Sequence, residues 1–207
     1  LAPADKKLYA LRDVTGTVDS IPLIASSVMS KKLASGAQAI LLDVKVGSGA
    51  FMKNIEDARE LAKAMVDIGK ENGRSVKAIL TDMDRPLGHA IGNALEIREV
   101  IDTLKGHGPE DLTHECIIMA AHMLVLSHKC DYETALSRVQ EALDSGAALE
   151  RLRMMIDAQD GDSRVIDDES LLAIGKFTYD VTAPQDGYII HMNTEQCGIA
   201  SVMLGAG

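Results

Sequence analysis

A serine and a lysine four residues apart, Ser27 and Lys31, are the first pair in this chain whose types and spacing could support chemistry. Side chains four positions apart on a helix lie on one face, so a hydroxyl and an ammonium would meet there. Arg12 lies in the preceding helical segment, and a helical hairpin would bring its guanidinium to the same place. Two cations and a hydroxyl suit an anion or an electron-rich heterocycle. The spacing is more typical of a solvated helix face, and the residues alone leave both interpretations open.

A glycine turn, Gly47-Ser48-Gly49, is a second candidate because it follows a short apolar segment. The turn after a strand is a usual place for a phosphate cradle in α/β proteins. This segment has neither the dinucleotide-binding pattern nor the P-loop pattern. A tight turn that requires glycine is therefore the better interpretation.

The histidines and acidic clusters show no metal-site pattern. His114, His122 and His128 are eight and six residues apart, whereas two imidazoles on one zinc typically lie four apart on a helix. The acidic segments 82–84 and 160–168 lack the EF-hand pattern. We interpret these residues as ordinary core, surface and loop positions.

The elements that would position the candidate residues follow from hydrophobic patterning. The sequence predicts a helix over 4–13, a second from a cap at Asp19-Ser20 to Ala34, a strand over 39–44, an amphipathic helix from Asn54 to Gly73 and a strand over 76–81. A strand, a helix and a strand with short links predict a β-α-β unit with parallel strands. The continuous apolar run at 39–44 is typical of a strand covered on both faces.

The later part of the chain changes character twice. Residues 90–158 are predicted to be mostly helical, and the acidic segment 157–169 to be a loop. Beyond it, 177–181 and 187–190 are rich in β-formers and are joined by a turn signal. We therefore expect an α/β fold with a mixed or parallel sheet flanked by helices, followed by the start of an α+β region.

Composition narrows the possible functions. The net charge of −10 argues against nonspecific binding of nucleic acid. No apolar run is long enough to cross a bilayer, which predicts a protein without a membrane partner. The three cysteines form no CxxC pair, which fits a reducing cytoplasm. The chain opens on Leu1 rather than Met, so we expect a fragment of a longer protein.

Several ordered motifs resemble one enzyme family. The segments that carry the resemblance are Leu1 to Thr15 (LAPADKKLYALRDVT), Ser20 to Ser27 (SIPLIASS) with Ser30-Lys31-Lys32, Asp43 to Met52 (DVKVGSGAFM), Thr81 to Asp84 (TDMD), Pro86-Leu87-Gly88 and Gly92 to Glu96 (GNALE). Together they resemble thymidine and pyrimidine-nucleoside phosphorylases, and the similarity runs over essentially the whole chain.

The resemblance implies a pentosyltransferase. Such an enzyme splits a pyrimidine nucleoside (uridine, thymidine or deoxyuridine) with phosphate as co-substrate, giving the free base and a (deoxy)ribose 1-phosphate. The resemblance assigns Arg12, Ser27 and Lys31 to binding of the pyrimidine base, with Arg12 and Lys31 as the catalytic cations. Negative charge develops on the pyrimidine ring as the glycosidic bond breaks, and these cations would stabilise it.

The resemblance also implies a structural potassium ion, a domain division and a homodimer. The potassium positions are Leu87 and Ala90, acting through backbone carbonyls, and Glu99, acting through its carboxylate. Residues 4–34 would belong to a small helical domain, 38–172 to an α/β domain and 173–207 to the start of a C-terminal α+β domain.

One family motif has no counterpart in the sequence. The glycine-rich phosphate signature of these enzymes is absent, so we expect the isolated chain to be nearly inactive unless a companion N-terminal fragment supplies it. The alternatives are a thymidine-restricted phosphorylase, a related phosphoribosyltransferase, or a non-catalytic oligomerisation or binding fragment.

Overall fold

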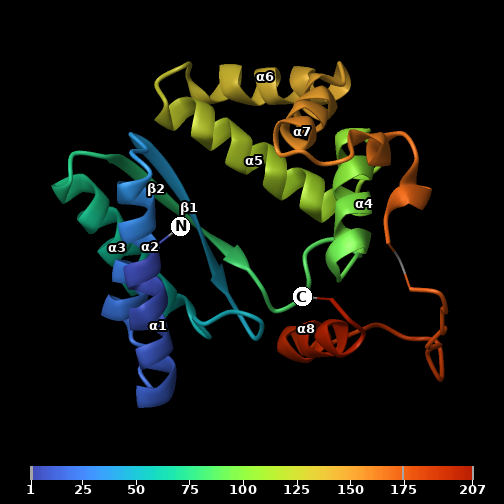
Figure 1. The fold of residues 1–207 in the computed structure, drawn as a ribbon, viewed down its shortest axis with the longest axis horizontal. Helices are drawn as coiled ribbons and strands as arrows, with labels where there is room; N and C mark the ends of the chain where they lie inside the picture. The colour runs from blue at the N-terminus through green and yellow to red at the C-terminus, as the bar shows by residue number, and fades with distance from the viewer. Residues whose placement is uncertain (1, 174, 207) are drawn as a thin grey trace. The chain divides into compact units, whose positions relative to one another are not determined.

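A computed structural model describes residues 2–173 and 175–206 of the 207-residue chain. Its elements, coloured along the chain in Figure 1, are in order α1 (Pro3–Thr15), α2 (Ile21–Ala34), β1 (Ala39–Val46), α3 (Ile55–Glu71), β2 (Ser75–Asp82), α4 (Asn93–Leu104), α5 (Glu110–Leu126), α6 (Tyr132–Asp144), α7 (Ala147–Ala158), the 3-10 turns η1 (Ser163–Ile166) and η2 (Glu169–Leu171), and α8 (Thr194–Met203). The chain forms two compact units, one of Leu1–Asp84 with Met119–Ala135, the other of Arg85–Ile118 with Leu136–Gly207.

The first unit contains the predicted β-α-β arrangement. Strands β1 and β2 pair in parallel, in register from Ala39 opposite Ser75 to Val46 opposite Asp82. Between them α3 begins at the cap Asn54, whose side chain accepts a hydrogen bond of 2.9 Å from the backbone N–H of Asp57. The α/β class expected from the sequence is confirmed by this helix-flanked parallel sheet.

Helices α2 and α3 cover one face of the sheet, as Figure 1 shows. Burial alternates along β1, where Ile40, Leu42 and Val44 are each at most 5% exposed while Asp43 is exposed. Met29 of α2 is fully buried in the same cluster. The expectation that this strand is covered on both faces is therefore wrong, because Ala39 and Asp43 on its other face are exposed.

The second unit is helical, with buried side chains from separate segments. Ile101 of α4 and Ile166 of η1 are both fully buried. Arg98 of α4 reaches Glu169 of η2, with 2.8 Å between Nε and Oε2. The segment 157–169, expected to be a loop, thus holds the short turn η1 as well as polar residues. No described helix combines the length and apolar character that crossing a bilayer requires.

Residues 177–181 and 187–190 do not form the expected strands. Both lie in irregular backbone, and α8 is the regular element described over 175–206. Phe177 is 94% exposed and Tyr188 97% exposed. A strand is held by hydrogen bonds to a neighbouring strand, and neither segment pairs with one in the described chain. High β-propensity without a partner strand therefore gave a wrong prediction here.

Candidate functional site

The predicted Ser27–Lys31 pair is formed on α2. Lys31 Nζ donates a hydrogen bond of 3.0 Å to Ser27 Oγ, as the four-residue spacing on one helix face predicts. The Lys31 side chain is 43% exposed, so the ammonium remains open to a ligand. The pair combines a donor-only ammonium with a hydroxyl that can donate or accept.

A carboxylate that the sequence patterns did not single out completes this group. Asp5, in the first turn of α1, places Oδ2 2.5 Å from Lys31 Nζ. Hydrogen bonds from Lys31 and then from Ser27 hold the pKa of Asp5 below its ordinary value. Acidic residues are common in the first turn of a helix because they complement the helix dipole. The position of Asp5 in the sequence therefore did not indicate its contact with Lys31, which lies 26 residues further along the chain.

Arg12, the third predicted base ligand, joins the same two helices in a different way. It is only 7% exposed. Its guanidinium donates to the backbone carbonyls of Thr17 (from Nε, 3.3 Å), Leu23 (from Nη1, 3.3 Å) and Val18 (from Nη2). A guanidinium has five N–H donors, and these backbone carbonyls take three of them. The structure therefore brings Ser27 and Lys31 into direct contact. Arg12 instead stabilises the turn between α1 and α2 through hydrogen bonds to its backbone carbonyls.

Gly47 lies in a turn whose geometry requires glycine. Its φ is +138°, and a Cβ there would collide with the backbone at Met83 and Asp84. The turn's amides already have protein partners, since Gly47 donates to Met52 O, Ser48 to Asp84 Oδ1 and Gly49 to Met83 O. These donors are not free to hold a phosphate, which supports the structural interpretation of the turn.

The three positions expected to hold potassium lie around one short loop of the second unit. Glu99 Oε1 accepts hydrogen bonds from the backbone N–H groups of His89 (2.8 Å) and Ala90 (3.0 Å). Gly88 has a φ of +70°, and a Cβ there would collide with the Glu99 carboxylate. Leu87 directly precedes this glycine. The Glu99 carboxylate beside this loop is an oxygen ligand of the kind that hard cations prefer.

Ala90 and Glu99 also line a hollow of about 470 Å³, together with charged and imidazole side chains that include Arg98, Asp102 and His107. The sequence patterns did not indicate this hollow. It gives the Glu99 loop access to solvent.

His122 has a structural role. Its Nδ1 lies 3.0 Å from Lys77 Nζ, and its ring stacks on that of Tyr132 with 4.8 Å between centroids. Burial and then the charge of Lys77 lower the pKa of His122. Across the described part of the chain, no three His, Cys, Asp or Glu side chains are grouped so as to hold a metal ion.

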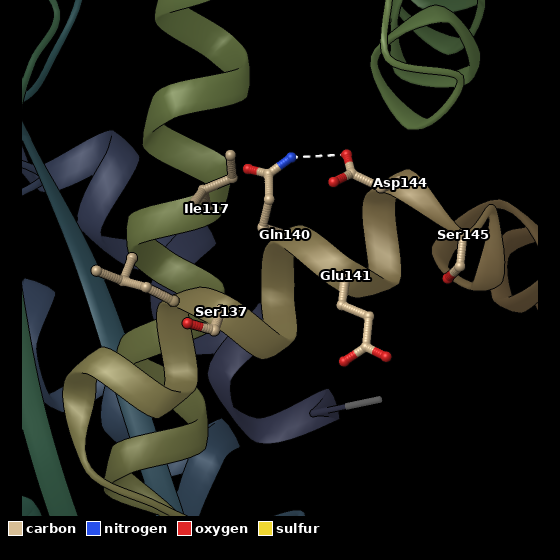
Figure 2. Close-up of a pocket in the computed structure, with 7 residues that line it drawn as sticks. Ile117, Ser137, Gln140, Glu141, Asp144 and Ser145 are labelled. Atoms are coloured by element: carbon tan, nitrogen blue, oxygen red, sulfur yellow. Dashed lines mark hydrogen bonds between the residues drawn. The ribbon is translucent and has the colours of Figure 1, made fainter.

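A hollow of about 690 Å³ lies along α6 (Figure 2). Figure 2 shows Gln140 turned toward Asp144 of the same helix, to which it donates a hydrogen bond of 2.8 Å. Glu141 points away from this pair. The polar groups interact along one helix and do not converge on a common point, so we assign no site here.

The class of protein to which this parallel, helix-flanked sheet belongs follows from a family comparison. Residues 1–149 match the a/b domain of the glycosyl transferase family, and the chain belongs to that family.

Named relatives are similar over the whole chain. Across 208 aligned residues the chain is 54% identical to a pyrimidine-nucleoside phosphorylase of Geobacillus stearothermophilus. It is 56% identical to proteins of the same name from Staphylococcus aureus strains RF122 and USA300. The alignment takes in 100% of this chain and 48% of each relative, so the chain spans about half the length of the curated relatives it matches.

Proposed function

We propose that the protein to which this chain belongs is a pentosyltransferase that splits pyrimidine nucleosides with phosphate, and that this chain carries the base site. The observation that carries the proposal is the Lys31–Ser27 hydrogen bond of 3.0 Å on an open helix face. The 54–56% identity to pyrimidine-nucleoside phosphorylases supports the reaction type.

The chemistry follows from charge. A phosphate oxygen forms a bond to C1′ of the sugar as the bond from C1′ to N1 of the base breaks, and the electron pair of the broken bond leaves with the base. Negative charge then spreads over the ring carbonyl oxygens. Lys31 stabilises that charge more strongly in the transition state than in the ground state, which lowers the barrier.

Ser27 and Arg12 have supporting parts in this scheme. The Ser27 hydroxyl hydrogen bonds the edge of the ring and fixes its orientation against Lys31. Arg12 adds a second positive charge beside the base through the N–H groups that the α1–α2 turn does not use. We assign no phosphate ligand among the described residues, because the amides of the Gly47 turn already have partners.

The test is phosphate-dependent release of uracil from uridine and of thymine from thymidine. The chain is assayed alone and in a chimera in which it replaces the matching 208 residues of the Geobacillus relative. Lys31→Ala should lower kcat/KM by about 10²–10³, the usual cost of one donor to a developing oxyanion. Lys32→Ala, which removes the same charge one position along α2, is the matched control and should stay near the parent value.

Two outcomes would contradict the proposal. One is a folded chimera that releases no base, and the other is a Lys31→Ala chimera as active as its parent. Replacing phosphate by pyrophosphate, with a base–ribose 5-phosphate as substrate, identifies a phosphoribosyltransferase. Comparing uridine with thymidine identifies a thymidine-restricted enzyme.

The finer properties are inferences of the same proposal. We infer a potassium ion held by the Leu87 and Ala90 carbonyls and the Glu99 carboxylate, since that carboxylate lies against the loop of residues 88–90. We infer a homodimer, which sedimentation equilibrium of the chimera would show or refute. The three free thiols fit a reducing cytoplasm, which cell fractionation would check.

A further inference from the structure

The hollow of about 470 Å³ beside α4 contains an arginine and an aspartate that are not among the proposed potassium ligands. Leu95, Arg98 and Asp102 line it, and their spacing of three and four residues places them on one face of α4. His107 and Pro109, from the segment after α4, line it as well. Pockets for small molecules usually measure about 300–1,000 Å³. The hollow is therefore large enough for a ligand much bigger than an ion.

Arg98 and Asp102 have opposite charges four residues apart, but the described structure does not pair them with each other. Glu169 of η2 pairs with the guanidinium instead, with 2.8 Å between its Oε2 and Arg98 Nε. The two terminal nitrogens of Arg98 carry four of its five N–H donors, and this ion pair is made through Nε. The side chain is 33% exposed and lines the hollow. Glu169 therefore holds the arginine in place while its terminal donors stay available to a ligand.

The Asp102 carboxylate is the acceptor at this hollow. It is half-buried and has no side-chain hydrogen bond or ion pair within the part of the chain that the structure describes. Glu99, the other carboxylate that lines the hollow, already accepts from the backbone N–H groups of residues 89 and 90. A partly buried charge without a partner has lost hydration without compensation. A ligand with N–H donors beside Asp102 would supply that compensation.

Guanine is complementary to this arrangement of a paired donor beside a paired acceptor. Its O6 and N7 atoms accept two hydrogen bonds from one arginine. Its neighbouring edge, N1–H and the 2-amino group, offers two parallel donors to a carboxylate. Adenine has an amino donor at position 6, where guanine has an acceptor, so it would turn a donor toward Arg98. Imidazole rings stack on bases, and His107 lines the same hollow with the apolar side chains of Leu95 and Pro109.

We propose that the hollow beside α4 binds the guanine ring of a purine nucleoside, with Arg98 on O6 and N7 and Asp102 on N1–H and the 2-amino group. This site is separate from the base site on α2 and does not depend on the proposed function. A zwitterionic amino acid would also match the two charges. Such a ligand has no flat ring for His107 and leaves much of the hollow unfilled.

The experiment measures binding of guanosine, inosine and adenosine to the full 207-residue chain by titration calorimetry. Inosine is guanosine without the 2-amino group, so it isolates one of the two contacts with Asp102. The variants are Asp102→Asn, which keeps the shape of the side chain, and Arg98→Lys, which keeps the charge beside Glu169 but loses the paired donors.

Two further variants are controls. Glu110→Gln removes a negative charge at an exposed position next to Pro109 that does not line the hollow. Lys31→Ala alters the base site on α2 and tests whether guanosine binds there instead. Thermal unfolding of each variant is recorded first, and Arg98→Lys carries the test if Asp102→Asn does not fold.

The unmodified chain should bind guanosine at least about tenfold more tightly than adenosine, which is within the discrimination that one paired contact gives. Asp102→Asn should weaken guanosine binding by about tenfold and remove the preference for guanosine over inosine, because an amide places a donor against the donors of the base. Arg98→Lys should weaken guanosine binding by a similar factor. Glu110→Gln and Lys31→Ala should bind guanosine as the unmodified chain does.

Four results would overturn the proposal. They are no binding of guanosine by the unmodified chain, equal affinity for guanosine and adenosine, full affinity for guanosine in a folded Asp102→Asn or Arg98→Lys variant, and loss of guanosine binding in Lys31→Ala. The last of these would place the ligand on α2. The release of uracil or thymine tests the proposed function independently of all four.

Discussion

At the scale of single residues, the polar group on α2 combines one contact within a helix with one contact between two helices. The Ser27–Lys31 contact follows from spacing within one helix, and the structure contains it. The Asp5 contact depends on how α1 lies against α2, which no local pattern encodes. Arg12 could be recognised as a cation, but its bonds to the carbonyls of the turn depend on the conformation of residues 17–23.

His122 provides a prediction at this scale. Burial and Lys77 lower its folded-state pKa below the ordinary value of 6.5, so the folded chain favours the neutral imidazole. The unfolded chain takes up a proton near pH 6.5, and the folded chain does so only at lower pH. The resulting stability is present above pH 6.5 and is lost as the pH falls through the folded pKa.

The measurement is the free energy of unfolding from urea titrations between pH 7.5 and 5.0. His122→Asn, which keeps an acceptor near the position of Nδ1, should reduce the loss of stability on acidification. His114→Asn, at an exposed position of the same helix, should retain the loss seen in the unmodified chain. An identical pH dependence in the His122→Asn variant would show that this imidazole does not contribute.

At the scale of elements, prediction succeeded where the pattern was periodic and local. The β-α-β unit was predictable because apolar residues recur with helical and strand periods and because Asn54 is a strong cap. The prediction of strands failed for 177–181 and 187–190, because a strand forms only when it pairs with a partner strand. The candidate site depends on both kinds of information, because helices α1 and α2 were predictable from local patterns and the way they pack against each other was not.

Two substitutions of glycine by alanine should have opposite effects, because one glycine is closely packed against β2 and the other has open space around it. Gly69 is buried in α3, and a Cβ there would collide with Cγ2 of the stiff side chain of Val76. Gly198 lies in α8, where a Cβ would meet nothing within 4 Å.

Gly69→Ala should lower the free energy of unfolding by about 1–3 kcal/mol, because overpacking outweighs the gain in helix propensity. Gly198→Ala should raise it by about 0.5–1 kcal/mol, because only the helix propensity changes. Urea unfolding of both variants measures the difference. A stabilising Gly69→Ala would mean that α3 and β2 are less closely packed than the structure shows.

At the scale of the whole molecule, the net charge of −10 affects how cation binding must be tested. An acidic protein gains stability from any added salt, because counterions screen its self-repulsion. A rise in stability with KCl alone therefore does not demonstrate a potassium site. Comparing KCl with NaCl at equal ionic strength removes the shared screening effect and leaves the specific one.

The potassium inference predicts a higher Tm in KCl than in NaCl. If the Kd is one tenth of the salt concentration, binding adds about 1.4 kcal/mol to the free energy of unfolding. Glu99→Gln should abolish the difference, because the amide keeps an acceptor for the His89 and Ala90 N–H groups but loses the charge that attracts the ion. Glu96→Gln is the matched control on the same helix, since Glu96 also accepts from a backbone N–H, that of Gly92 at 2.8 Å. Equal Tm values in the two salts for the unmodified chain would rule out a selective ion at this loop, whereas a difference that survives Glu99→Gln would place the ion elsewhere.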